Sequence, residues 1–434
     1  MNDNSTGNNS NSTPQSPIAL TPEQSAAVQA LLDFIADPSP SQWFFTLSGF
    51  AGTGKTFCMR EVIARTRASH VKMAFTAPTN KAAKVLRSIT GEAGTIYSLL
   101  GLRIDKSGEL KQIVAGKKTD LSDTDVIFID EASMVNQNLF SILQKECDRS
   151  YTKVVFMGDA AQLPPVGEPH SAVWDGSLGV ALTRVMRHDN QILTLATAIR
   201  TAMGTIAPSI NIKSDNDDAG GVWKLTKADF KRQLFDAATR GEFDDGTKAK
   251  AIAWRNVKVA EYNDIIRHAI FGAAAVPGFY LAGDRIVAAG PCERGDEVLL
   301  ATDDEAIVED VAMCKHPLEP KYNAMELKCR TELNKIIRLL VLHPSSATQF
   351  KNDSEQLAFD ARGNRRLWKK FWAHQELFHQ VKYGYALTAH RAQGSTYETV
   401  FADYQDILQN RNRKEAFQCL YTAVTRPTTR LYLA

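Results

Sequence analysis

WFFTLSGFAGTGKT, residues 43–56, decides the fold, because it joins an apolar strand pattern to the motif G-x-x-x-x-G-K-[ST]. The segment FCMREVIART, residues 57–66, follows it as a helix. Glycines in such a loop let backbone N–H groups close on phosphate oxygens, the lysine neutralises phosphate charge and the last hydroxyl binds Mg²⁺. The sequence therefore predicts a nucleotide phosphate site made by Gly52, Thr53, Gly54, Lys55 and Thr56.

Short apolar segments alternate with helical ones on both sides of this loop, which is the pattern of an α/β protein with parallel sheets. Each apolar segment lacks polar alternation, as strands covered on both faces do. The strand candidates of a first unit are 43–49, 70–77, 125–130 and 153–159, and those of a second unit lie in 250–256, 383–394 and 428–434. Two α/β units are therefore expected.

Two inserts interrupt these units. The smaller, residues 102–113, has two β-capable arms around Lys106, Ser107 and Gly108 and predicts a hairpin. The larger, residues 291–380, mixes short strands with a stretch rich in basic and aromatic residues. Its rings Trp368, Phe371 and Trp372 fit either a packed helix face or a stacking surface for single-stranded nucleic acid. The sequence leaves both interpretations open.

Adjacent acids, Asp130 and Glu131, close the apolar run at 126–129. They could be ordinary solvent-facing acids. After a phosphate loop, however, this position favours Asp130 as a ligand of an Mg²⁺ water and Glu131 as the group that polarises an attacking water.

Glutamines and arginines in other motifs have equally plausible structural roles. Gln24 can complete a capping box with Thr21 at the start of a helix. Gln162 follows the fourth strand, at the sheet edge where ligands of open α/β folds bind. Arg187 and Arg426, taken alone, are surface charges.

Composition and charge bound the class of protein. The 434 residues hold 51 Lys and Arg against 49 Asp and Glu, and 44% are hydrophobic, which excludes wholesale disorder. Six scattered cysteines without a C-x-x-C pair fit a reducing compartment. No run of apolar residues is long enough to cross a membrane. We therefore expect a cytoplasmic protein, in the host cytoplasm if it comes from a phage, with a disordered tail over 1–19.

Ten motifs, taken in order, resemble the motif series of superfamily 1 helicases. They are TPEQ (21–24), GFAGTGKT (49–56), APTNKAA (77–83), TIYSLLG (95–101), VIFIDEASM (126–134), GDAAQLPPVGE (158–168), TRVMRHD (183–189), AIAWRN (251–256), ALTAHRAQGST (386–396) and LYTAVTRPTTRLYL (420–433). Their spacing is most similar to superfamily 1B, the RecD-like class, and the compact length resembles phage helicases of the Dda type. The resemblance covers about residues 20–434.

That resemblance implies two RecA-like P-loop motor domains that share one ATP. It places the first at 20–178, with a pin hairpin inserted at about 101–120. The second comprises 179–290 and 381–434, and an SH3-like β-rich domain is inserted at 291–380. It also implies ATP-dependent 5′ to 3′ translocation on single-stranded DNA with unwinding of duplex DNA.

Individual roles are implied in the same way. Gln24 would read adenine, and Lys55, Thr56, Asp130 and Glu131 would serve phosphate, Mg²⁺ and water. The γ-phosphate would be contacted by Gln162, Arg187 and Arg426, with Gly394 close to the nucleotide and the strand. Implied DNA contacts are Pro78, Thr79, Asn80, Lys81, Thr95, Ser98, His390, Ser395 and Thr396. Two positions depart from the family pattern: Tyr97 stands where His is frequent, and Arg391 where Lys is frequent.

The expected partners are single-stranded and forked DNA, with replication or single-strand-binding proteins as further candidates and no membrane. Because both halves of an ATP site are present in one chain, we expect a monomer. Two alternatives remain at this point: an RNA or RNA–DNA hybrid helicase, and a DNA-stimulated ATPase that remodels protein partners without unwinding.

Overall fold

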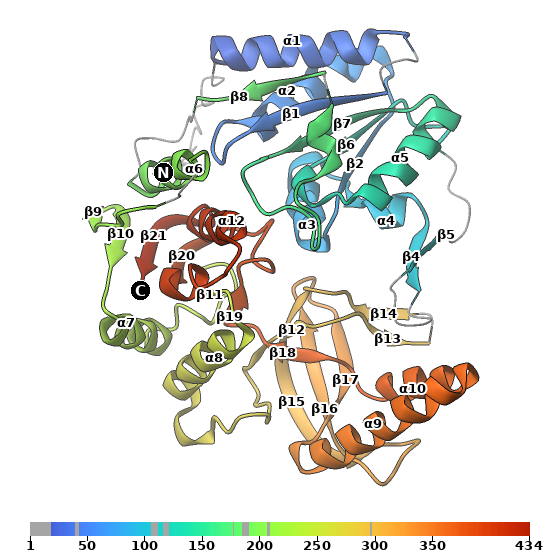
Figure 1. Ribbon diagram of the computed structural model, residues 1–434, viewed down its shortest axis with the longest axis vertical. Helices are drawn as coiled ribbons and strands as arrows, with labels where there is room; N and C mark the ends of the chain where they lie inside the picture. The colour runs from blue at the N-terminus through green and yellow to red at the C-terminus, as the bar shows by residue number, and fades with distance from the viewer. Residues whose placement is uncertain are drawn as a thin grey trace, which may run out of the picture.

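A computed structural model describes residues 19–39, 43–105, 112–115, 121–176, 178–184, 191–205, 209–295 and 297–434. Within this part of the chain, two α/β units and a β-rich insert are arranged around a common centre (Figure 1). The predicted tail and the turn at 106–108 lie outside the described residues.

The first unit is built on a six-stranded parallel sheet with the order β3-β2-β6-β7-β1-β8. Its strands are β1 (Phe44–Gly49), β2 (Met73–Ala77), β3 (Gly94–Thr95), β6 (Val126–Ile129), β7 (Lys153–Gly158) and β8 (Gly179–Leu182). Helices α1 (Pro22–Ala36), α2 (Lys55–Thr66) and α3 (Asn80–Thr90) cover one face, and α4 (Ile96–Leu99) and α5 (Gln137–Ser150) cover the other. The four strands predicted for this unit are confirmed.

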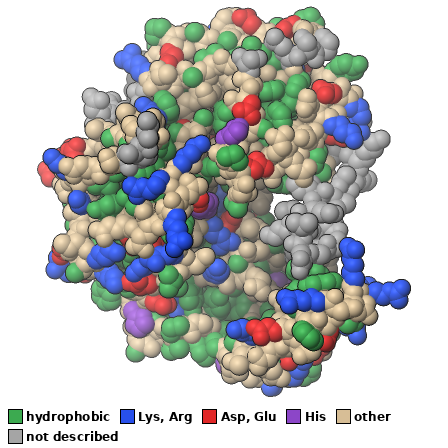
Figure 2. Space-filling view, viewed as in Figure 1, with side chains coloured by type: hydrophobic (Ala, Val, Ile, Leu, Met, Phe, Trp, Pro, Cys, Tyr) green, Lys and Arg blue, Asp and Glu red, His purple; other side chains and the backbone are tan. Residues whose placement is uncertain are grey.

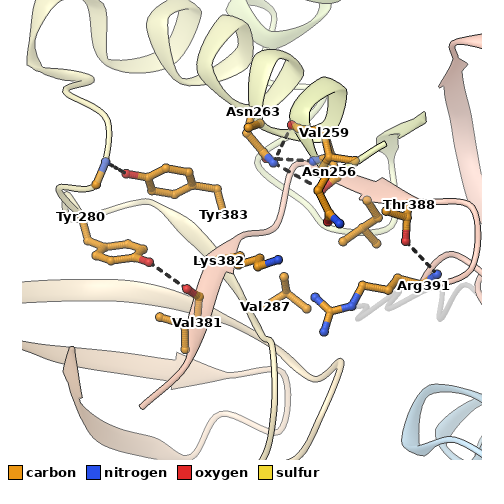
Figure 3. A pocket seen from close by; sticks show the side chains of 14 residues that line it. Asn256, Val259, Asn263, Tyr280, Val287, Val381, Lys382, Tyr383, Thr388 and Arg391 are labelled. Carbon is orange, nitrogen blue, oxygen red and sulfur yellow. Dashed lines mark hydrogen bonds between the residues drawn. The ribbon is translucent and has the colours of Figure 1, made fainter. Parts of the chain in front are cut away.

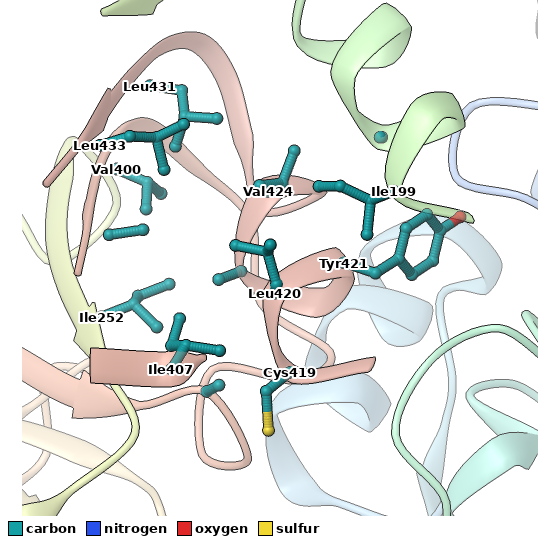
Figure 4. Packing of buried hydrophobic residues seen from close by; sticks show 14 of the residues in the cluster. Ile199, Ile252, Val400, Ile407, Cys419, Leu420, Tyr421, Val424, Leu431 and Leu433 are labelled. Atoms are coloured by element: carbon teal, nitrogen blue, oxygen red, sulfur yellow. The ribbon is translucent and has the colours of Figure 1, made fainter. Parts of the chain in front are cut away.

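The second unit contains the sheet β19-β11-β20-β21-β10-β9, in which only β9 is antiparallel among the described strands. Its strands are β9 (Asp215–Asp217), β10 (Gly220–Lys224), β11 (Ala249–Ala253), β19 (Ala386–Thr388), β20 (Tyr397–Ala402) and β21 (Pro427–Leu433). Helices α6 (Gln191–Met203), α11 (Tyr404–Ile407) and α12 (Arg413–Val424) pack on one face, and α7 (Lys227–Thr239) and α8 (Asn256–Phe271) on the other. Figure 4 shows Leu420 and Val424 of α12 between Ile199 of α6 and sheet residues such as Val400.

The insert is an antiparallel sheet with the order β17-β16-β15-β12-β18. Its strands are β12 (Arg285–Ala288), β15 (Glu305–Lys315), β16 (Asn323–Thr331), β17 (Ile336–Leu342) and β18 (Val381–Tyr383), and a hairpin of β13 (Cys292–Arg294) and β14 (Glu297–Leu300) accompanies them. Helices α9 (Ala347–Gly363) and α10 (Trp368–Gln375) complete it. In α10 the rings of Trp368, Phe371 and Trp372 are half-buried against one another, which favours the packing role for these rings.

Two predicted borders need correction. β8 pairs with β1, so the border at 178/179 falls inside the first unit. This edge strand was missed because it is short and only partly buried. The insert sheet also takes up strands β12 and β18, so it reaches beyond 291–380 on both sides. A further antiparallel pair, β4 (Leu102–Asp105) and β5 (Gln112–Ala115), lies in the segment 102–113 predicted as a hairpin, and the residues that connect the two strands lie outside the described part of the chain.

A buried ion pair fixes the junction between α8 and the start of the insert. Both Arg267 and Asp284 have fully buried side chains, and the guanidinium donates to the carboxylate through Nε at 2.8 Å and Nη2 at 2.9 Å. Arg267 also donates to the Phe279 carbonyl at 2.8 Å and lies over the ring of Tyr383. The pair therefore joins helix α8 of the second unit to the residue that directly precedes strand β12 of the insert.

Replacing Arg267 with Met should lower the free energy of unfolding by about 3 to 5 kcal/mol, because Asp284 would remain buried without its partner. Arg232, which forms an exposed pair with Asp229, offers the control, and Arg232→Met should cost no more than about 1 kcal/mol. Urea unfolding followed by tryptophan fluorescence measures both. Equal losses in the two variants would contradict the assigned role.

Candidate functional site

The predicted phosphate loop lies between β1 and α2, with Gly52 and Gly54 in the left-handed region at φ 81° and 91°. A side chain at Gly54 would crowd Gln24 Nε2 and would strain the left-handed backbone, so this position favours glycine. Lys55 Nζ donates to the Gly49 and Phe50 carbonyls at 2.6 and 3.0 Å. The Lys55 ammonium is thus hydrogen-bonded to carbonyl groups of the loop itself. The backbone N–H groups at the start of α2, including that of Thr56, are oriented for an anion.

Gln24 has the predicted capping role and also contacts the phosphate loop. It completes the capping box of α1, where its Oε1 accepts from the Thr21 N–H at 3.1 Å. Its Nε2 donates to the Thr53 carbonyl at 3.1 Å, so the same side chain lies against the phosphate loop.

The acid pair lies at the end of β6. Asp130 Oδ1 accepts from the Glu131 N–H at 2.9 Å, and Glu131 has a left-handed backbone at φ 53°. Burial raises the pKa of both carboxyls, while Lys55 opposes the shift at Asp130 and Arg426 opposes it at Glu131. A hard cation held by Asp130 and Thr56 would stabilise the ionised carboxylate, so these oxygen donors fit Mg²⁺.

Arg426 brings the second unit to this site. It follows α12, is 5% exposed and donates to the Thr422 carbonyl at 3.0 Å and the Ser395 carbonyl at 3.1 Å. Its positive charge lowers the pKa of Glu131, the acid of the first unit, against the effect of burial. The predicted contact of Arg426 with the γ-phosphate stays a prediction.

Further hydrogen bonds join the units beside the site. Tyr421 donates its hydroxyl proton to Asp159 at 2.7 Å, and Gln393 Nε2 donates to Ser133 Oγ at 3.2 Å. Gln418 Nε2 donates to the Gln162 carbonyl at 3.3 Å. The Gln162 side-chain oxygen is buried without a hydrogen-bond partner in the described part of the chain, so it has capacity for a ligand.

Arg200 is a site residue that the sequence did not reveal. Its guanidinium carbon lies 3.4 Å from the centroid of the Phe50 ring in the phosphate loop, although it belongs to α6 of the second unit. No motif marks it, because an arginine in a helix resembles any surface charge. Arg187, by contrast, lies outside the described residues.

Two of the three segments predicted to contact nucleic acid meet across the units. Thr79 caps α3 by accepting from the Ala82 N–H at 3.3 Å. Gly394, at φ 74°, lies so close that its Cβ position would be 3.7 Å from Thr79 Oγ1. The loops at 78–81 and 390–396 are therefore neighbours. In the face shown in Figure 2, the surface is hollowed where the three parts of the molecule meet, and Lys and Arg side chains border it on the second unit.

The other residues predicted to contact nucleic acid differ in their exposure to solvent. Thr95 and Ser98 are hydrogen-bonded to each other at the start of α4, and Thr396 is exposed. Ser395 is buried, with a hydroxyl that has no hydrogen-bond partner in the described chain. His390 lies 3.6 Å from Glu415, and burial lowers the pKa of its imidazole.

The two departures from the family pattern are both accommodated. Tyr97 packs in the apolar layer under the first sheet. Arg391 pairs with Asp303 at 3.0 Å and lines a cavity of about 260 Å³ between α8, β18 and β19 (Figure 3). Lys382 and Asn256 line the same cavity. Because Arg391 belongs to the 390–396 loop, the cavity adjoins that loop.

No helix among the described residues is both long and apolar enough to cross a membrane. No disulfide links the six cysteines, all of which the structure describes.

Comparison with known proteins agrees with this geometry. Residues 19–217 match the family described as AAA domain, and residues 383–434 match the UvrD-like helicase C-terminal domain. The chain is 24% identical to the uncharacterized protein R530 of Acanthamoeba polyphaga mimivirus, with 94% of this chain and 98% of that protein covered. It is 25% identical to the ATP-dependent DNA helicase dda of Enterobacteria phage T4, over 88% and 92%. A Pif1 helicase of Psychrobacter sp. is 38% identical over 28% of this chain and 20% of its own length.

The family models match the two parts of the chain that supply the phosphate loop and Arg426, in the order that the motifs predicted. The chain is thus a homologue of the Dda, Pif1 and RecD2 helicases.

Proposed function

We propose that the chain is an ATP-dependent DNA helicase that translocates 5′ to 3′ on single-stranded DNA and unwinds duplex DNA. The observation that carries the proposal is the composite site. The phosphate loop and acid pair belong to the first unit, Tyr421 and Gln393 of the second unit contact Asp159 and Ser133 beside them, and the charge of Arg426 acts on Glu131. The relatives named ATP-dependent DNA helicases support the choice of reaction and substrate.

In this account the two units are RecA-like motors. Lys55 would leave the Gly49 and Phe50 carbonyls for the β- and γ-phosphates, and Gln24 would contact the adenine. Glu131 would accept a hydrogen bond from the attacking water, and Gln162, Arg187 and Arg426 would hold the γ-phosphate. Mg²⁺, held by Thr56 and Asp130, would neutralise phosphate charge.

Nucleotide binding would favour closure of the two units, because the site is complete only when Arg426 faces Glu131. Hydrolysis would then allow the units to open. The loops 78–81 and 390–396 would grip the strand alternately. Opening one base pair costs about 1.4 kcal/mol in stacking. A step of one base per ATP would therefore be limited by geometry and not by the energy supply. We further propose that the β4–β5 hairpin is the pin and that the antiparallel sheet is an SH3-like domain.

Unwinding assays on duplexes with a 5′ or a 3′ single-stranded tail test the proposal. Only the 5′-tailed DNA should be unwound, and DNA should stimulate ATP hydrolysis more than RNA of the same sequence does. Unwinding from the 3′ tail would refute the direction, and stimulation without unwinding would favour a remodelling ATPase.

Lys55→Ala should abolish ATP hydrolysis, because it removes the cation that meets the phosphates, while the fold persists. Lys72→Ala, at an exposed lysine paired with Asp123, is the control and should retain activity. A steady-state phosphate-release assay with single-stranded DNA measures both. Substantial turnover by Lys55→Ala would refute the phosphate-loop assignment.

Arg426→Ala should reduce DNA-stimulated turnover by a factor on the order of 10³ and leave DNA affinity nearly unchanged, as expected for an arginine that acts across the cleft. Arg430, four residues away and paired with Glu398, is the matched control. Near-normal turnover by Arg426→Ala would contradict a role for Arg426 of the second unit in ATP hydrolysis.

Replacing residues 103–112 with a short Gly-Ser link should reduce duplex unwinding while DNA-stimulated ATP turnover persists. The hairpin would act as a wedge that blocks one strand as the motors pull the other. The number of base pairs unwound per ATP on a fork is the diagnostic quantity. If that number is unchanged in the variant, strand separation must be assigned to another element.

A further inference from the structure

A single carboxylate, Glu305 at the start of β15, gathers three cations. Its oxygens lie 3.0 Å from Lys81 Nζ, 3.0 and 3.1 Å from Lys250 Nζ and 3.3 Å from Arg285 Nη2. The Glu305 side chain is 3% exposed and Lys250 is 1% exposed, whereas Lys81 is 17% exposed. Lys81 is therefore the one of these three cations with the most access to solvent.

The three cations come from different parts of the molecule. Lys250 belongs to β11 of the second unit, and Arg285 belongs to β12 of the insert. Lys81 belongs to α3 of the first unit, in the segment proposed to contact DNA. A second ion pair, between Lys84 and Glu332, also joins α3 to the insert. Figure 1 shows α3 at the edge of the first unit that faces the insert.

The charge balance around Glu305 would survive the departure of Lys81. Burial by itself would raise the pKa of Glu305, but Lys250, Lys81 and Arg285 outweigh it and hold the pKa at about 2. Lys250 also donates to the Gly384 carbonyl at 2.7 Å, so it remains in place by its own contacts. Without Lys81, the carboxylate would still face two cations.

We propose that Glu305 is a positioning residue for the DNA grip: in the protein without DNA it holds Lys81 against the insert, and a backbone phosphate of the bound strand replaces it. This inference rests on the proposed function, since it requires single-stranded DNA as the ligand. The exchange replaces one anionic partner of Lys81 with another. It breaks the Lys81–Glu305 ion pair and leaves the pair between Lys84 and Glu332 in place. Strand binding and the attachment of the first unit to the insert are then competing states.

Competition predicts that removing the Glu305 carboxylate strengthens DNA binding, but only while Lys81 is present. Fluorescence anisotropy with labelled oligothymidine should show affinity raised by about three- to tenfold in Glu305→Gln relative to wild type. In the Lys81→Met background, Glu305→Gln should produce no gain. This double-mutant cycle separates the pair from a general change in charge.

Glu309→Gln is the matched control, because Glu309 lies on the same strand and pairs with Lys328 and Arg330 within the insert. It should produce no gain that depends on Lys81. Glu305→Asp keeps a negative charge for Lys250 and Arg285 while it withdraws the carboxylate from Lys81, and it should raise affinity in the same direction even if Glu305→Gln does not fold.

The outcomes distinguish the two proposals. If wild-type protein does not bind oligothymidine, the proposed function fails and this inference fails with it. If wild type binds but neither Glu305 variant gains affinity, or the gain persists without Lys81, then only the positioning role of Glu305 is overturned.

Discussion

The structure depends on the junction between its two α/β units, where polar side chains are buried beside the phosphate loop. Polar groups buried at the junction need partners, and they find them across it. Tyr421 reaches Asp159, and Gln393 reaches Ser133. The charge of Arg426, which is hydrogen-bonded within the second unit, also lowers the pKa of Glu131 in the first. These contacts hold the units in register around the phosphate loop, so a change in the nucleotide has a direct route to the relative position of the two sheets.

Local features could be predicted from the sequence, whereas contacts between distant segments could not. The phosphate loop and its strand were predicted because their chemistry lies within 14 consecutive residues. The capping role of Gln24 was predicted from three-residue spacing, and the structure adds its contact with Thr53. Arg200 was missed because nothing in a helical sequence indicates that its side chain lies on Phe50. The edge strand β8 was missed because it is too short and exposed to show a buried-strand pattern.

The insert connects the second unit to the first through contacts that lie outside the proposed nucleotide site. Its sheet is anchored to α8 through Arg267 and Asp284, both fully buried. At its other side Glu305 meets Lys81 of α3. If DNA displaces Glu305 from Lys81 as proposed, the insert would stay attached to the second unit while its contact with the first depends on bound DNA.

The central claim is that the nucleotide is shared by the two units of one chain. The most direct measurement is a structure of the protein with Mg²⁺, a non-hydrolysable ATP analogue and single-stranded DNA. The account predicts that Lys55 leaves the Gly49 and Phe50 carbonyls and that the Arg426 guanidinium lies within hydrogen-bonding distance of the γ-phosphate. An analogue bound with Lys55 still on those carbonyls, or with Arg426 out of reach, would contradict it.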